Sequence, residues 1–105
     1  MPTKVYAGTE VQVDDQGFFT DPSQWREEMA AGIAAEEDIP ELTEGHWQVI
    51  KFMRHEFDTK GTGPTVRVLG KTSGIAIKEL YQLFPGGPAK VAARIAGIPK
   101  PRGCI

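Results

Sequence analysis

The only cysteine of this 105-residue chain is Cys104, the penultimate residue, in the ending KPRGCI. A cysteine reacts with other sulfur atoms as its thiolate, and a free cysteine has a pKa of about 8.5. Lys100 and Arg102 lie beside it, and together with Arg94 they favour ionisation, whereas the terminal carboxylate of Ile105 opposes them. The pattern predicts a reactive thiol whose surroundings attract anionic sulfur species or an acidic partner surface.

The last eight residues are predicted to form an extended arm, residues 98–105, that follows a globular domain of residues 1–97. Pro99 and Pro101 push the residues before them toward extended geometry, and such an arm reaches at most about 25 Å. Gly103 adds a flexible joint without a side chain, which lets Cys104 enter a narrow cavity. The alternative is that a terminal cysteine is an accident of a frayed chain end.

Composition predicts one ordinary globular domain, because 40% of the residues are hydrophobic and 25% are charged. A single cysteine cannot form an internal disulfide bond. The N-terminus lacks the layout of a signal peptide, and no uncharged apolar run approaches the roughly 18 residues of a membrane span. We therefore expect the protein in the reducing cytoplasm, without a membrane partner.

Charge is distributed unevenly, although the net charge is only −2. Residues 1–45 hold eleven acidic residues and two basic ones, whereas residues 46–105 hold three acidic residues and ten basic ones. Cys104 thus belongs to the positive half of the chain.

The first half of the chain is predicted to contain strands and then a helix. The first twenty residues alternate apolar and polar around turn-forming residues, which predicts a small antiparallel β meander. Asp21 is the expected N-cap of a helix with Pro22 at its first position. Trp25, Met29 and Ile33 then recur every four residues along one helix face, which should pack against the meander.

A second helix is predicted to begin after Thr43 and to end near Gly61. Its inward side chains are expected to be Trp47, Ile50, Met53 (or Val49) and Phe57. Two short helices should follow as a helix–turn–helix. The second of these carries a stripe that we expect to be buried, formed by Ile77, Leu80, Tyr81 and Phe84.

A last helix is predicted from Pro88, with Val91, Ala92 and Ile95 on one side and Gly97 as its stop. The expected fold class is therefore α+β. It comprises a mostly helical orthogonal bundle of about five helices, a small N-terminal β meander and the extended C-terminal arm.

The segment LYQLFPGGPAKVAARIAGIPKPRGCI resembles the C-terminal signature of the DsrC/TusE family, which ends in proline-lysine-proline and a penultimate cysteine. The segments DDQGFFTDPSQWREEMA, EGHWQVIKFMR and GPTVRVLGK are similar to earlier parts of the family pattern, so the resemblance covers nearly the whole chain. It implies a cytoplasmic sulfur carrier that holds a persulfide on Cys104. The implied partners are a sulfurtransferase donor and either a sulfur-accepting protein or a sulfite reductase, and no cofactor or metal is expected.

The family has two branches, and this chain resembles both. One branch, the gamma subunit of dissimilatory sulfite reductase, uses a second cysteine on the last helix, and the other relays sulfur toward tRNA thiolation with the penultimate cysteine alone. Ala93 occupies the second position here, so an intramolecular disulfide is excluded. The compact stretch VRVLGKTSGIAIKELY and the ending PRGCI are nevertheless closer to the sulfite-reductase branch.

Other classes of function compete with the carrier. A cysteine–histidine enzyme would need His46 or His55 near the thiol, but nine residues place them about 180° apart on the second helix. The chain is thus expected to be a carrier substrate, or a sulfurtransferase if it counts as an enzyme. A docking or regulatory subunit of a sulfite reductase-type complex is a further alternative.

A nucleic-acid-binding regulator is the remaining alternative, because the helix–turn–helix outline is accompanied by basic residues. These residues are Arg67, Lys71, Lys78, Lys90, Arg94, Lys100 and Arg102. The slightly acidic chain and the scatter of these charges over several segments argue against this function.

Overall fold

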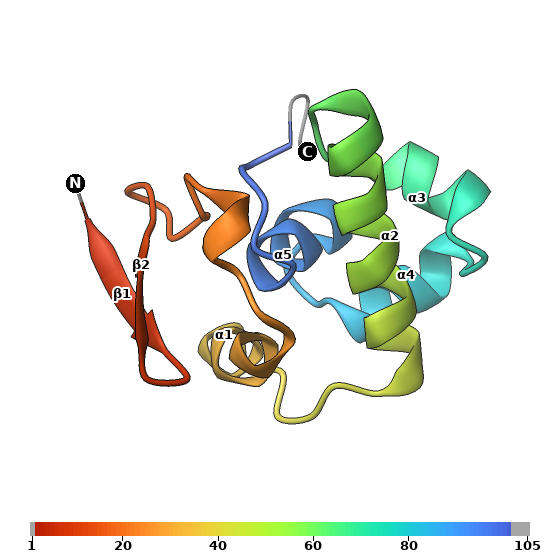
Figure 1. The fold of residues 1–105 in the computed structure, drawn as a ribbon. Coiled ribbons are helices and arrows are strands. Elements are labelled where there is room, and N and C mark those ends of the chain that lie inside the picture. The colour runs from red at the N-terminus through yellow and green to blue at the C-terminus, as the bar shows by residue number, and fades with distance from the viewer. Residues whose placement is uncertain (1, 102–105) are drawn as a thin grey trace.

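The computed structural model describes residues 2–101 of the chain. Within this range, a two-stranded hairpin and two short 3-10 turns precede five α-helices (Figure 1). This architecture confirms the predicted α+β class with a mostly helical bundle. None of the helices in the described range is both long and apolar enough to cross a membrane.

The predicted β meander is a hairpin of β1 (Thr3–Tyr6) and β2 (Thr9–Gln12). The strands are antiparallel, and the first residue of β1 pairs with the last residue of β2. Ala7 and Gly8 form the two-residue turn with φ of 49° and 77°. Positive φ at both positions gives a turn whose twist matches that of the strands.

The single helix predicted from Pro22 is wrong. The segment forms two 3-10 turns, Pro22–Gln24 and Glu27–Met29, before α1 (Ala30–Glu36) begins. Asp21 caps the first turn as predicted, since its carboxylate accepts a backbone N–H at 3.1 Å. Trp25 interrupts the helix because its backbone is extended, with ψ of 141°, and its side chain binds a distant part of the chain.

The second predicted helix is confirmed as α2 (Glu44–Lys60), with Thr43 as N-cap and Gly61 in the left-handed region at its end. The N–H of Thr43 donates to Nδ1 of His46 at 3.0 Å, which leaves the ring proton on Nε2. Nε2 then donates to the carbonyl of Leu83 at 2.7 Å. His46 therefore joins the start of α2 to the end of α4 (Ile77–Leu83).

The helix–turn–helix is confirmed, but its predicted buried stripe is only half buried. Its helices are α3 (Val66–Thr72) and α4 (Ile77–Leu83). Leu80 and Phe84 are fully buried, whereas Ile77 and Tyr81 are 46% and 51% exposed. The rest of the protein therefore covers only part of the apolar face of α4.

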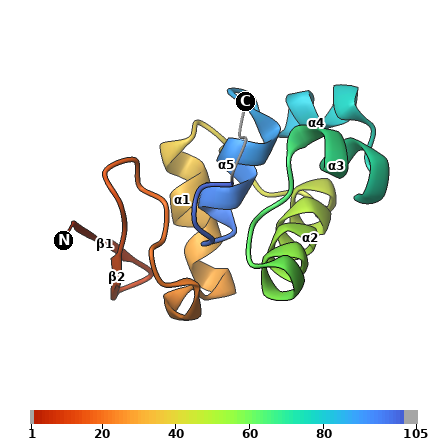
Figure 2. The same cartoon turned by 90° about the horizontal axis from the view of Figure 1, so that it is seen from above.

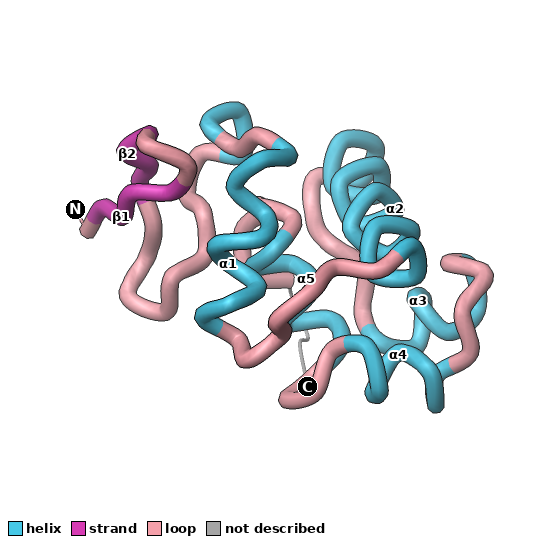
Figure 3. Tube along the Cα trace, turned by 90° about the horizontal axis from the view of Figure 1, so that it is seen from below, coloured by secondary structure: helices cyan, strands magenta, loops and turns pink. Residues whose placement is uncertain are grey.

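The last helix, α5 (Pro88–Ile95), lies at the centre of the molecule, between α1 and α2 (Figures 1 and 2). All of its residues except Lys90 are buried. The tube view from below shows the hairpin beside α1, and it shows α3 and α4 on the other side of the molecule, beside α2 (Figure 3). Since α5 is surrounded by the rest of the protein, the packing around it fixes the position of its C-terminal end.

Candidate functional site

The predicted thiol follows the C-terminal end of α5. Three of the predicted site residues lie outside the described range: Arg102, Gly103 and Cys104. Residues 97–101, here called the arm root, are described, and in them Pro99 is partly buried, Lys100 exposed and Pro101 buried. The arm root and the residues that hold it set the place from which the rest of the arm starts.

The arm root begins with a Schellman motif, which ends α5 and turns the chain. The N–H of Ile98 donates to the carbonyl of Ala93 at 3.2 Å, and the N–H of Gly97 donates to the carbonyl of Arg94 at 3.2 Å. Gly97 has a φ of 70°, in the left-handed region that glycine adopts without strain. The motif fixes the direction in which Ile98 leaves the helix.

Trp25 and Arg54 bind the last carbonyl oxygens of α5, which lack partners inside the helix. Nε1 of Trp25 donates to the carbonyl of Ile95 at 2.8 Å, and Nη1 of Arg54 donates to that of Ala96 at 2.7 Å. The guanidinium lies 4.4 Å from the centre of the indole ring, a cation–π contact. Its Nη2 also donates to the carbonyl of Pro22 at 3.2 Å. This Trp25–Arg54 clamp ties the end of α5 to α2 and to the first 3-10 turn.

The clamp was missed at the level of sequence. The four-residue spacing with Met29 and Ile33 predicts Trp25 on a helix face, and nothing singles out Arg54. The available signal was chemical: a half-buried indole N–H needs an acceptor, and helix ends present free carbonyl groups. Burial lowers the pKa of the Arg54 guanidinium, and the nearby charge of Asp58 opposes this shift.

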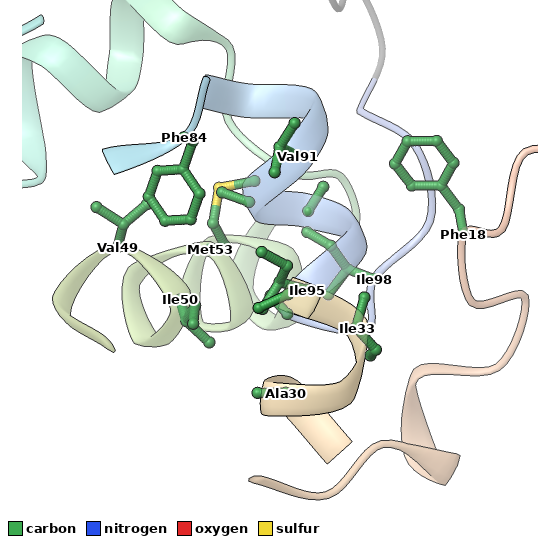
Figure 4. Packing of buried hydrophobic residues seen from close by; sticks show 14 of the residues in the cluster. Phe18, Ala30, Ile33, Val49, Ile50, Met53, Phe84, Val91, Ile95 and Ile98 are labelled. Carbon is green, nitrogen blue, oxygen red and sulfur yellow. The ribbon is translucent and has the colours of Figure 1, made fainter. Parts of the chain in front are cut away.

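Residues 98–101 pack against the body. Ile98 is fully buried, and its side chain lies in the core with Ile95 and Ile33 (Figure 4). Ile98 and Pro101 also pack closely against Gly63, in the loop between α2 and α3. There is no room for a side chain at Gly63, because an added Cβ would lie 2.8 Å from Cδ1 of Ile98 and 3.2 Å from Cγ of Pro101. Burial of an isoleucine side chain stabilises by about 1.5–3 kcal/mol. Any hinge of the arm is therefore expected beyond Ile98.

Arg94 lies in an ion-pair cluster with Glu36 and Glu37 at the end of α1. Its Nη1 donates to Oε2 of Glu37 at 2.6 Å, and its Nη2 donates to Oε1 of Glu36 and, at 3.4 Å, to the hydroxyl oxygen of Tyr6. The Tyr6 hydroxyl and the Lys4 ammonium each donate to the Glu36 carboxylate at 2.9 Å. The cluster connects the hairpin, α1 and α5.

The cluster shifts the pKa values of its members. Burial would raise the pKa of the Glu36 carboxyl, but hydrogen bonds from Lys4, Arg94 and Tyr6 lower it below its usual value. Burial, and then the hydrogen bond to Glu36, raises the pKa of Tyr6, so its phenol stays protonated. Burial lowers the pKa of Arg94, but hydrogen bonds to Glu36 and Glu37 outweigh the effect of burial, so the pKa is raised. The charge of Arg94 is therefore compensated within the cluster.

The remaining candidate residues are separated. His46 is buried with both ring nitrogens bonded, and His55 is exposed. Within residues 2–101, no group of three His, Cys, Asp or Glu side chains is placed to hold a metal ion. Arg94, one of the basic residues that a nucleic-acid-binding face would require, is only 7% exposed and lies against two carboxylates, so the structure does not support its part in that alternative.

The fold and the arm root define a class of protein: a small helical α+β domain whose central helix ends in a glycine-turned, proline-containing arm. The family model described as "DsrC like protein" matches residues 5–105. The chain belongs to this DsrC-like family, which confirms the resemblance seen in the sequence.

Two relatives illustrate the branches. The gamma subunit of dissimilatory-type sulfite reductase from Nitratidesulfovibrio vulgaris is 36% identical over 105 residues, with 100% of both chains covered. The sulfurtransferase TusE of Photorhabdus laumondii is 43% identical over 108 residues, with 96% of both chains covered.

Two solved structures have the same fold. The crystal structure of dissimilatory sulfite reductase I (DsrI) contains a chain that matches with a TM-score of 0.88 at 36% identity, over 99% of this chain and 100% of that chain. The oxidised gamma subunit (DsrC) from Archaeoglobus fulgidus matches with a TM-score of 0.82 at 38% identity, over 99% and 100% of the two chains.

Proposed function

We propose that this protein is a sulfur carrier, which holds a persulfide on Cys104 and hands its outer sulfur from one protein to another. The family and its members named for sulfur transfer and sulfite reduction support the proposal. The observation that carries it is the position of the only thiol, three residues beyond the buried Pro101. That residue belongs to an arm root whose start is fixed by the Schellman motif and the Trp25–Arg54 clamp.

The proposed chemistry is an exchange between a thiolate and a persulfide. The Cys104 thiolate attacks the outer sulfur of the donor persulfide, a new S–S bond forms as the old one breaks, and the donor cysteine leaves as a thiolate. An acceptor thiolate then attacks the outer sulfur on Cys104 in the same way. Each step replaces one S–S bond by another, so neither step needs an external oxidant or reductant.

The arm residues take distinct roles in this proposal. Pro99 and Pro101 stiffen the arm, and Gly103 lets the thiol enter a narrow site. Lys100 and Arg102 favour the thiolate and attract acidic partners. Since the charge of Arg94 is compensated, we assign to it mainly the fixing of α5 against α1.

Ala93 limits the carrier to chemistry with one thiol. It is fully buried on α5, where a second cysteine would be needed for an intramolecular disulfide. Cys104 therefore releases its sulfur only when an acceptor attacks it. The proposed partners are a sulfurtransferase donor and either a sulfur-accepting protein or a sulfite reductase.

Incubation with inorganic tetrasulfide at pH 7, followed by intact-mass measurement, tests this function. The chain is expected to gain one sulfur atom, and Cys104→Ser is expected to gain none. Lys100→Met combined with Arg102→Met should load several-fold more slowly because less thiolate is present, whereas the control Arg26→Met should load normally. Equal loading of Cys104→Ser, or no loading of the wild type, would reject the carrier.

A further inference from the structure

Helix α4 leaves two large apolar side chains uncovered. Ile77 is 46% exposed and Tyr81 is 51% exposed, and they lie one turn apart on the same side of the helix. Among the described residues, Val5 in β1 is the one other large hydrophobic side chain with comparable exposure. Exposed apolar surface is thus concentrated on α4.

Helices α3 and α4 form one continuous surface. Gly70 in α3 has no side chain, and a Cβ there would lie 2.8 Å from Cδ1 of Ile77 in α4. This close approach lets Ile77 lie across α3 while part of its side chain stays exposed. A partner that covers Ile77 and Tyr81 would therefore contact both helices.

This surface carries a net positive charge, although the chain as a whole is slightly acidic. Residues 66–83 contain three exposed basic residues and one exposed acidic residue, Glu79, and so carry a charge of +2. The other residues carry −4, which gives the net charge of −2. The basic residues form no ion pair with any residue in the range 2–101. They are Arg67, Lys71 and Lys78.

The surface also adjoins the arm root. Gly63, which contacts Ile98 and Pro101, lies in the loop that leads directly into α3. Cys104 is three residues beyond Pro101, and three residues span at most about 10 Å. A protein bound to α3 and α4 would therefore lie close to the region that the Cys104 thiol can reach.

We propose that α3 and α4 form the docking surface for the protein that donates sulfur to Cys104, and that this donor presents an apolar pocket with an acidic rim. The inference rests on the proposed carrier function. Tyr81 and Ile77 supply the apolar anchors, and aromatic side chains are frequent anchors of protein interfaces. The three unpaired cations select an acidic rim and speed encounter with it. A pair of apolar anchors with only three exposed cations favours a protein over a nucleic acid, whose phosphate backbone is bound through many Lys and Arg contacts.

Two sulfur donors separate docking from chemistry. Loading of Cys104 is measured by rapid quench and intact mass, with inorganic tetrasulfide as one donor and a persulfidated rhodanese-type sulfurtransferase of the same organism as the other. Tyr81→Ser and Lys78→Glu are expected to slow transfer from the protein at least 10-fold and to leave transfer from tetrasulfide unchanged. The matched controls Val5→Ser and Arg26→Glu should leave both rates unchanged.

Several results would overturn the docking surface. The first is that Tyr81→Ser and Lys78→Glu both accept sulfur from the donor protein at the wild-type rate. The second is that these variants are slowed equally with the donor protein and with tetrasulfide. The third is that the wild type accepts sulfur from tetrasulfide but not from the donor protein. Self-association in sedimentation that Tyr81→Ser abolishes would make the surface an interface between copies, and tRNA binding that Lys78→Glu abolishes would make it a nucleic-acid site. Failure of the wild type to load from tetrasulfide would instead reject the carrier function.

Discussion

Replacement of Gly97 by alanine is expected to destabilise the fold by about 2–5 kcal/mol. A side chain in the left-handed region costs about 1–2 kcal/mol, and Gly97 has a φ of 70°. The new Cβ would also overlap the indole of Trp25 and lie 2.6 Å from the Cβ of that residue. Overpacking of this kind costs about 1–3 kcal/mol. The loss is measured by urea unfolding at pH 7.

Gly61→Ala is the matched control. Gly61 ends α2 with a φ of 75°, but a Cβ there would have no neighbouring atom within 4 Å. Only the backbone strain should appear, so the loss should be about 1–2 kcal/mol. An equal loss in Gly61→Ala and Gly97→Ala would show that the contact with Trp25 does not hold the arm root.

Arg94→Met is expected to cost about 2–3 kcal/mol at neutral pH. Removal of one partner from a buried ion pair costs about 3–5 kcal/mol, and the 37% and 28% exposed carboxylates of Glu36 and Glu37 reduce that loss. Lys4→Met is the control, because Lys4 also pairs with Glu36 but is 39% exposed, and it should cost less than about 1 kcal/mol. Equal losses would contradict a structural role of Arg94.

The same cluster predicts how stability depends on pH. The folded-state pKa of Glu36 lies below its usual value of 4.5, so the folded protein binds fewer protons than the unfolded chain in this range. The stabilisation is therefore present above about pH 4.5 and is lost as the pH falls below it. Arg94→Met removes one of the hydrogen bonds that lower the pKa of Glu36. In urea titrations between about pH 6 and 3, the free energy of unfolding of this variant should therefore fall less steeply than that of the wild type. An unchanged slope would contradict the assignment.

The helix boundaries were predictable where the signal is local. Thr43 and Gly61 bracket α2, and Pro88 and Gly97 bracket α5 with its cap, since caps and stops act on neighbouring backbone groups. The interruption at Trp25 was not predictable, because its hydrogen-bond acceptor lies 70 residues away in the sequence. A local four-residue spacing cannot report such a partner.

The candidate site was predictable only in part. Cys104 as the candidate thiol and the proline pattern of the arm follow from the sequence, but the surroundings of Arg94 do not, since its carboxylate partners are 57 and 58 residues away. Arg54 was missed for the same reason, because it binds a carbonyl 42 residues away. The spacing of Ile77 and Tyr81 shows an apolar face, yet it cannot show whether the body covers that face.

Delivery of sulfur to a second protein tests the carrier most directly. The chain is loaded with isotopically labelled sulfur, freed of donor, mixed with a thiol-containing acceptor protein and followed by intact mass. We predict that the chain loses one labelled sulfur atom as the acceptor gains it, at a rate that rises with acceptor concentration. Label that stays on the chain, or that appears only as free sulfide, would contradict a relay through Cys104.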